Sequence, residues 1–214
     1  MDKPLILIGY RYSVYTRIVR MALIEMGLSA EYVEVNPFSD PSDPELAAHS
    51  AFGRVPVLRH GDFTLTETAA ILRYLDAIGP GLSLAPTAAQ PAARMAQIIG
   101  IVDAYAYWPL VRDVFGAAFF APHQGQPVDL ARIATGLSNA QPSLQTLNAI
   151  ADEGLQLDGA DITLADLHLA PMIAYFSMAD EGAAALARYP ALLSWWAAVR
   201  NRSSLQQTDP FARR

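Results

Sequence analysis

Three hydroxyl side chains lie close together near the start of the chain, in the segment Gly9-Tyr10-Arg11-Tyr12-Ser13. An apolar run precedes this segment and an amphipathic helical pattern follows it, so it connects a predicted strand to the N-terminus of a predicted helix. A hydroxyl can donate a hydrogen bond to an anion, and the N–H groups and dipole of a helix N-terminus also favour negative charge. The segment is therefore suited to stabilise an anion. Serine is also a favoured N-cap, so Ser13 has a purely structural interpretation as well.

Two later segments have a similar ambiguity. Pro56 begins a predicted strand, where an ordinary edge-strand proline would remove one donor from the ladder. Glu67 and Thr68 begin a second predicted helix, where they could bind charged groups. Capping by Thr66, with Glu67 as a first-turn charge, would explain the same residues.

Composition excludes several classes of protein. The chain has no cysteine, which removes disulfides, thiolate metal sites and cysteine nucleophiles, and no other spacing indicates a metal site. Its formal net charge is −6 and its Lys and Arg residues do not cluster, so we expect no nucleic-acid partner. The longest apolar region, residues 98–111, contains Asp103 and is too short to span a bilayer. With no signal-peptide pattern at the start, we expect a cytoplasmic protein that does not contact membranes.

The elements that must position these residues follow from the hydrophobic pattern of residues 1–79. Apolar runs and alternation predict strands, amphipathic stretches predict helices, and His60-Gly61-Asp62 predicts a tight hairpin turn. The predicted strands span residues 5–8, 32–35, 55–59 and 63–66, and the predicted helices begin near residues 14, 43 and 68. The resulting order, β-α-β-α-β-β-α, is that of a thioredoxin-like domain.

The second half of the chain has a different pattern. Residues 80–90 are rich in Gly, Ser, Pro and Ala, which is typical of a linker. Residues 91–214 show helical patterns at about 91–120, 128–151, 164–178 and 190–201. We therefore predict an α/β domain followed by an all-α helical bundle.

Four motifs together resemble the glutathione transferase family over essentially the whole chain. They are residues 9–20, Gly53-Arg54-Val55-Pro56-Val57-Leu58, residues 65–71, and Ile162-Thr163-Leu164-Ala165-Asp166-Leu167. The last is a capping box with a hydrophobic staple, which has a structural role. The helix after it is apolar almost all round and should be the buried spine of the helical domain.

The resemblance implies glutathione as co-substrate and a serine-type site. Ser13 matches the serine that activates the glutathione thiol, with Tyr12 and Tyr10 as rival hydroxyls on the same turn. The thiolate is the nucleophile, and a free cysteine thiol, with a pKa of about 8.5, is mostly protonated at neutral pH. The protein's hydroxyl would therefore activate a nucleophile that the co-substrate carries.

The resemblance also implies the remaining contacts with glutathione. Pro56 would follow a cis peptide bond that presents the backbone N–H and C=O of Val55 to the cysteinyl part of glutathione. Glu67 would bind the γ-glutamyl ammonium group, and the hydroxyl and N–H of Thr68 would bind the γ-glutamyl carboxylate.

An apolar pocket for the second substrate is expected from aromatic residues of the helical domain, and a homodimer is implied by the family. The first candidates for the pocket are Tyr107 and Phe115. Four more aromatic residues lie nearby in the sequence: Tyr105, Trp108, Phe119 and Phe120. Each of the six could equally be a core or dimer contact. The leading function is conjugation of glutathione to a small hydrophobic electrophile, with detoxification as one possible role. The alternatives are a specialised glutathione-dependent ether cleavage, isomerisation or dehalogenation, and a non-catalytic binding module of the same fold. A thiol-disulfide reductase would need an active-site cysteine, which this chain does not have.

Overall fold

The computed structural model describes residues 3–212, which form two compact units. Within the described residues, unit 1 consists of residues 3–84 and 203–212, and unit 2 of residues 85–202. From the sequence we predicted that residues 203–214 belong to the helical domain, whereas the structure groups residues 203–212 with the N-terminal unit. The difference arises because Ser204 and Leu205 are buried against the first helix of unit 1.

Unit 1 is built on a four-stranded mixed sheet with the order β2-β1-β3-β4. The strands are β1 (Leu5–Gly9), β2 (Ala30–Glu34), β3 (Val57–His60) and β4 (Phe63–Leu65). Strand β1 pairs parallel to β2 and antiparallel to β3, and β3 pairs antiparallel to β4. The predicted order β-α-β-α-β-β-α is confirmed, and with it the thioredoxin-like arrangement.

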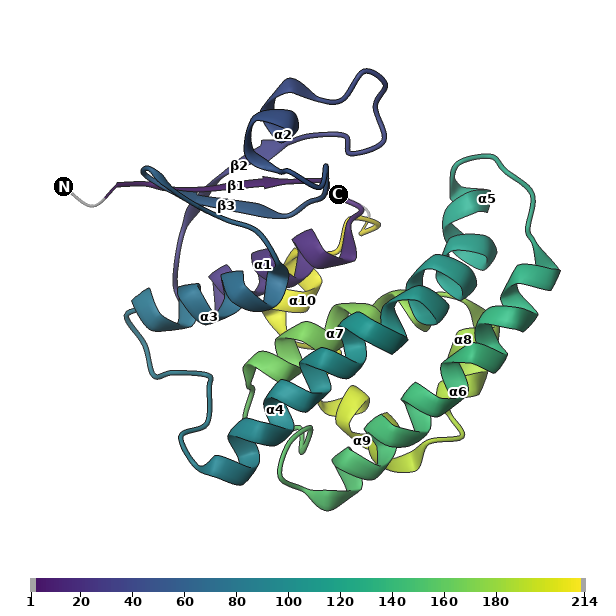
Figure 1. The fold of residues 1–214 in the computed structure, drawn as a ribbon. Coiled ribbons are helices and arrows are strands. Elements are labelled where there is room, and N and C mark those ends of the chain that lie inside the picture. Colours follow the sequence, from purple (N-terminus) through teal and green to yellow (C-terminus); the bar gives the residue numbers. More distant parts are fainter. Residues whose placement is uncertain (1–2, 213–214) are drawn as a thin grey trace. The chain divides into compact units, whose positions relative to one another are not determined.

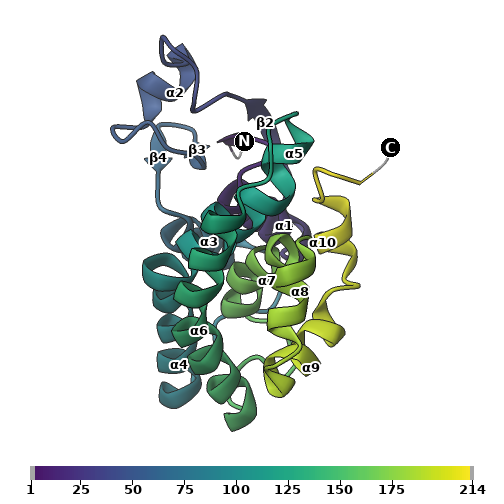
Figure 2. The ribbon, with the colours of Figure 1, turned by 90° about the vertical axis from the view of Figure 1, so that its right-hand side faces the viewer.

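Helices cover both faces of this sheet (Figure 1). They are α1 (Val14–Glu25), α2 (Pro44–His49), α3 (Thr68–Ile78) and the short α10 (Ser203–Gln207). Helices α1 and α3 lie on one face and α2 lies on the other, while α10 lies beside α1 (Figures 1 and 2). The strands alternate accordingly: Ile8 and Val57 pack with Leu46 of α2, so their buried neighbours Leu7 and Leu58 point to the opposite face.

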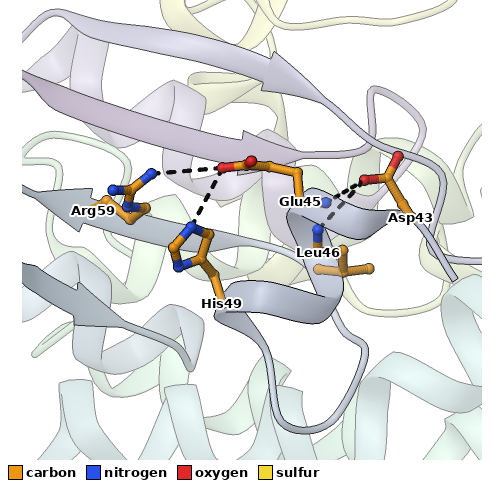
Figure 3. Close-up of polar contacts among 5 residues, drawn as sticks. All are labelled: Asp43, Glu45, Leu46, His49 and Arg59. Atoms are coloured by element: carbon orange, nitrogen blue, oxygen red, sulfur yellow. Dashed lines mark hydrogen bonds and ion pairs between the residues drawn. The ribbon is translucent and has the colours of Figure 1, made fainter.

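Helix α2 is joined to the sheet by polar side chains (Figure 3). Asp43 caps its N-terminus by accepting from the N–H groups of Glu45 and Leu46, which agrees with the predicted start of a helix near residue 43. The Glu45 carboxylate then lies 3.4 Å from His49 Nε2 and 3.6 Å from Arg59 Nη1 on β3. The contact with Arg59 thus joins α2 to β3.

All elements assigned in unit 2 are helical. They are α4 (Ala89–Ile101), η1 (Val102–Ala106), η2 (Trp108–Phe120), α5 (Ala121–His123), α6 (Leu130–Glu153), α7 (Leu164–Phe176), α8 (Asp180–Leu186) and α9 (Pro190–Val199). The predicted helix over residues 91–120 is thus α4 continued by two π-helical segments, η1 and η2. Every residue of α7 is buried, so the predicted spine is confirmed, as is the capping box of Thr163 and Asp166. Among residues 3–212, no helix combines the length and apolarity that a membrane span requires.

Candidate functional site

Ser13 stands at the N-cap of α1, as its structural interpretation predicted. Its backbone N–H donates to the Tyr10 carbonyl at 2.8 Å and closes a tight turn over residues 10–13. Its Oγ accepts from the Thr16 N–H at 3.3 Å, so the capping prediction is confirmed. That bond uses an oxygen lone pair and leaves the hydroxyl hydrogen able to donate. A half-buried donor therefore lies where the positive end of the α1 dipole favours an anion.

The close approach of α1 to the end of β1 depends on Gly9. A Cβ at this position would lie 2.4 Å from Thr16 Cγ2, closer than side chains tolerate. Thr16 is fully buried and its Oγ1 also accepts from the Tyr10 N–H at 3.3 Å. Gly9 therefore allows Thr16 to anchor the turn that carries the three hydroxyl groups.

The two rival hydroxyls are engaged differently from Ser13. The Tyr12 hydroxyl accepts from Arg11 Nη2 at 2.6 Å, and the Tyr12 ring lies 5.3 Å from the ring of Phe211. The Tyr10 ring packs edge-on against Tyr12 at 5.6 Å and against Phe38 at 5.9 Å. Burial, with smaller effects from neighbouring groups, raises the pKa of Tyr10, so this phenol stays protonated at neutral pH.

Glu34, at the end of β2, supports the same turn from the neighbouring strand. Its carboxylate accepts from the Arg11 N–H at 3.1 Å and from the Tyr32 hydroxyl at 2.5 Å. Burial and this hydrogen bond to Glu34 raise the pKa of Tyr32. Glu34 and Phe211 could not be identified from the sequence, because only the parallel pairing of β1 with β2 and the return of the C-terminal segment bring them to the turn.

The segment before β3 adopts the conformation that the resemblance implied. The Val55–Pro56 peptide bond is cis, Pro56 is buried and Val55 is half-buried. The buried Ser50 hydroxyl bonds both the N–H and the C=O of Arg54 at 3.0 Å, which holds the preceding loop. Gly53 has a φ of +58°, a conformation that glycine adopts without steric cost.

Glu67 and Thr68 begin α3, and their backbone is unusual. Glu67 has φ 65° and ψ 114°, a region that residues other than glycine rarely occupy. Its side chain is exposed, whereas Thr68 is buried. Helix α3 has no side-chain cap, so the alternative of capping by Thr66 is wrong. An observed backbone outlier at a helix N-terminus supports a functional interpretation of Glu67.

The aromatic residues expected around the second substrate separate into two groups within unit 2. Phe115 is 4% exposed and stacks on Tyr175 at 4.4 Å, which is a core contact. Tyr107 is half-buried and meets the exposed Trp108 edge-on at 6.3 Å. Tyr107 is thus closer to the surface than Phe115. Among residues 3–212, no group of three or more His, Asp or Glu side chains is placed to hold a metal ion.

Comparison with known proteins identifies the family. Residues 7–83 match the glutathione S-transferase N-terminal domain, and residues 131–198 match the C-terminal domain of the same family. Glutathione S-transferase F13 of Arabidopsis thaliana is 27% identical over 207 residues, which cover 95% of this chain and 94% of that protein. The structure of an apo glutathione S-transferase III is 28% identical with a TM-score of 0.82, covering 96% of this chain and 95% of that one. A glutathione S-transferase I bound with lactoylglutathione is 25% identical with a TM-score of 0.81, covering 96% and 98%. With both family domains matched in order and relatives similar over nearly their whole length, this chain belongs to the glutathione S-transferase family.

Proposed function

We propose that this protein is a glutathione transferase that stabilises the thiolate of glutathione for attack on a small apolar electrophile. The observation that carries the proposal is the position of Ser13, a hydroxyl donor at the N-cap of α1. The glutathione derivative bound by the similar transferase I supports glutathione as the co-substrate.

The energetics of this role are within the reach of a single hydroxyl at a helix N-terminus. Lowering a thiol pKa by two units requires preferential stabilisation of the thiolate by about 2.7 kcal/mol. A hydrogen bond to a charged group contributes about 1.5–3 kcal/mol, and a helix dipole adds about 0.3–1 kcal/mol. Ser13 and α1 together can therefore make the thiolate the main form near neutral pH.

The rest of unit 1 would bind glutathione away from its sulfur. Val55, which precedes Pro56, would exchange backbone hydrogen bonds with the cysteinyl residue. Glu67 would accept from the γ-glutamyl ammonium group, and Thr68 would bind the γ-glutamyl carboxylate through its hydroxyl and the N-terminal N–H groups of α3. We propose residues 1–79 as the glutathione-binding domain on this basis.

The chemical step would form a carbon–sulfur bond between the thiolate and an electrophilic carbon. With an activated aryl halide, the halide ion leaves; with an enone, the resulting carbanion takes a proton. No metal takes part in either step. We propose Tyr107 of the helical domain as a contact for the apolar part of the electrophile, because Phe115 is already packed against Tyr175.

Two further properties belong to this proposal. We infer that the protein acts in the cytoplasm. We also infer that it assembles as a homodimer, since symmetric dimers are the commonest assembly. Sedimentation at micromolar concentration would contradict the dimer if it gave the mass of one 23.2 kDa chain.

The experiment that tests the proposed function is a pH titration of bound glutathione followed by thiolate absorbance. The parent protein is expected to form thiolate near pH 6.5, about two units below the pKa of a free thiol. Ser13→Ala should lose most of this thiolate, while Tyr12→Phe should keep it. Equal thiolate in the parent and in Ser13→Ala would exclude Ser13 as the donor, and an absence of glutathione binding would favour the non-catalytic module.

A further inference from the structure

The C-terminal segment of the chain, residues 203–212, returns to unit 1 and is fastened along α1. Arg17 Nη2 donates to the Leu205 carbonyl at 2.9 Å. Two turns further along α1, Glu25 accepts a hydrogen bond from the Ser204 hydroxyl. Figures 1 and 2 both show α10 beside α1. The segment is thus held at two points by side chains of the helix that Ser13 caps.

Arg17 is an unusual residue for a purely structural contact. It is only 3% exposed. Removing a charge from water costs several kcal/mol, so buried ionic groups are often replaced by apolar side chains without loss of stability. The presence of Arg17 is therefore better explained by the position in which its hydrogen bond holds Leu205 than by a contribution to stability.

Beyond α10 the segment continues to the hydroxyl turn. The Thr208 hydroxyl donates to the Ser204 carbonyl at 2.8 Å, and the Phe211 N–H donates to Asp209 Oδ1 at 2.9 Å. These local bonds define the path of the chain after α10. That path brings the ring of Phe211 to 5.3 Å from the ring of Tyr12, with 31° between the ring planes.

Tyr12 lies inside the turn that ends at Ser13. The bond from the Ser13 N–H to the Tyr10 carbonyl closes this turn. A ring packed on Tyr12 therefore restricts the residue directly before Ser13. Arg17 lies one helical turn after Ser13, so a single face of α1 carries both the proposed donor and the residue that holds the tail.

We propose that Arg17 is a positioning residue that acts through the C-terminal segment: it holds Leu205 so that Phe211 packs on Tyr12 and keeps the Ser13 hydroxyl aimed at the thiol. This inference rests on the proposed function, because it concerns the same thiolate. It adds a role for a residue that would not touch glutathione and for a segment about 200 positions away in the sequence. Catalytic hydrogen bonds are sensitive to small displacements, which gives such an indirect contact its importance.

Removing the Arg17 charge and truncating Phe211 in the same protein distinguishes the proposed mechanism from two competing ones. If Arg17 stabilised the thiolate by its own charge, its removal would act independently of Phe211. If both residues acted by independent routes, their effects would likewise add. If Arg17 acts through the tail, its removal should change nothing once Phe211 has been truncated.

The test is a double-mutant cycle of Arg17→Met and Phe211→Ala on the full chain, read as the pH at which bound glutathione is half thiolate. Each single variant is expected to raise this pH by about half to one unit, which is about three- to tenfold less thiolate at a fixed pH. The double variant should show no larger shift than either single one. The matched control is Arg20→Met, which removes the same charge from the same helix; the Arg20 guanidinium lies over the Tyr32 ring instead of the tail.

Hydrogen exchange supplies a readout that does not depend on glutathione. Arg17→Met should speed the exchange of amides in residues 203–212, and Arg20→Met should not. Additive shifts, an unchanged midpoint in Phe211→Ala, or unchanged tail exchange in Arg17→Met would each overturn the proposal. Failure of the proposed function is separable from these outcomes, because it would be seen in the parent protein alone as an absence of bound thiolate.

Discussion

The backbone of Glu67 leads to a prediction in which two substitutions differ in their effect on stability but weaken glutathione binding equally. With φ 65° and ψ 114°, Glu67 occupies a conformation that costs a residue with a side chain on the order of 1–3 kcal/mol. Glycine adopts this region freely but loses about 0.5–1 kcal/mol more conformational entropy on folding. Glu67→Gly should therefore be more stable than Glu67→Ala by about 0.5–2 kcal/mol, although both variants lose the same exposed carboxylate.

Both substitutions should also weaken glutathione binding. If the carboxylate pairs with the γ-glutamyl ammonium group, its loss removes a charge-assisted bond of about 1.5–3 kcal/mol. The dissociation constant measured by calorimetry should then rise about 10- to 150-fold in each variant. Glu67→Gln is the matched control, because it keeps the strained backbone and the length of the side chain while removing the charge.

The stability comparison needs a probe that reports unit 1. The protein's three tryptophans, Trp108, Trp195 and Trp196, all belong to unit 2, so their fluorescence would follow the other unit. Hydrogen exchange of the amides of β1 and β3 measures the opening free energy of the sheet itself. A glycine variant no more stable than the alanine variant would refute the argument from backbone strain. Unchanged affinity in both variants would remove Glu67 from the glutathione site.

Two further predictions concern unit 2. Asp166 is buried and accepts from the Thr163 N–H at 2.8 Å and from Trp195 Nε1 at 2.7 Å, so Asp166→Ala should lower the unfolding free energy by about 2–4 kcal/mol in urea titrations. Burial raises the pKa of Asp166, so its carboxyl group binds a proton more tightly in the folded state than in the unfolded state. The difference in unfolding free energy between the parent and Asp166→Ala should therefore be greatest below about pH 4 and should become smaller as the pH rises through the elevated pKa. Asn148 Oδ1 accepts from the first N–H groups of α9 at 3.0 and 3.2 Å, so Asn148→Ala should cost about 1 kcal/mol by the same titration. Asn148→Asp should retain the cap and add a favourable charge at the helix N-terminus; equal stability of the two variants would contradict the capping argument.

Local patterns predicted most of the fold correctly. Strand alternation and helix periodicity identified the order of elements in unit 1, because each depends on neighbours a few residues away. Short-range caps were equally well predicted: Ser13 and the pair Thr163–Asp166 occupy the positions expected of them. The long helix over residues 91–120 was found, but its π-helical part was not, since hydrophobic periodicity does not distinguish such segments.

Local patterns were less informative about aromatic residues. Six aromatic side chains between residues 105 and 120 could each be pocket, core or interface residues, and the sequence analysis placed Tyr107 and Phe115 first for the pocket. The structure separates them: Phe115 is packed on Tyr175 of α7, while Tyr105 and Trp108 are 69% and 59% exposed. Which side of a helix faces the core depends on how the helices of unit 2 pack together, and a helix that is apolar on several sides leaves that choice open.

The sequence by itself determined the family, the order of elements in the first unit and the hydroxyl at the start of α1, because motifs and caps are encoded within a few residues. Only the tertiary structure brought Leu205 to Arg17 and Phe211 to Tyr12, in the turn that ends at Ser13. It alone also revealed the strained backbone of Glu67. Contacts across nearly the whole chain and the backbone angles of one residue depend on the packing of the complete fold, which no local pattern specifies.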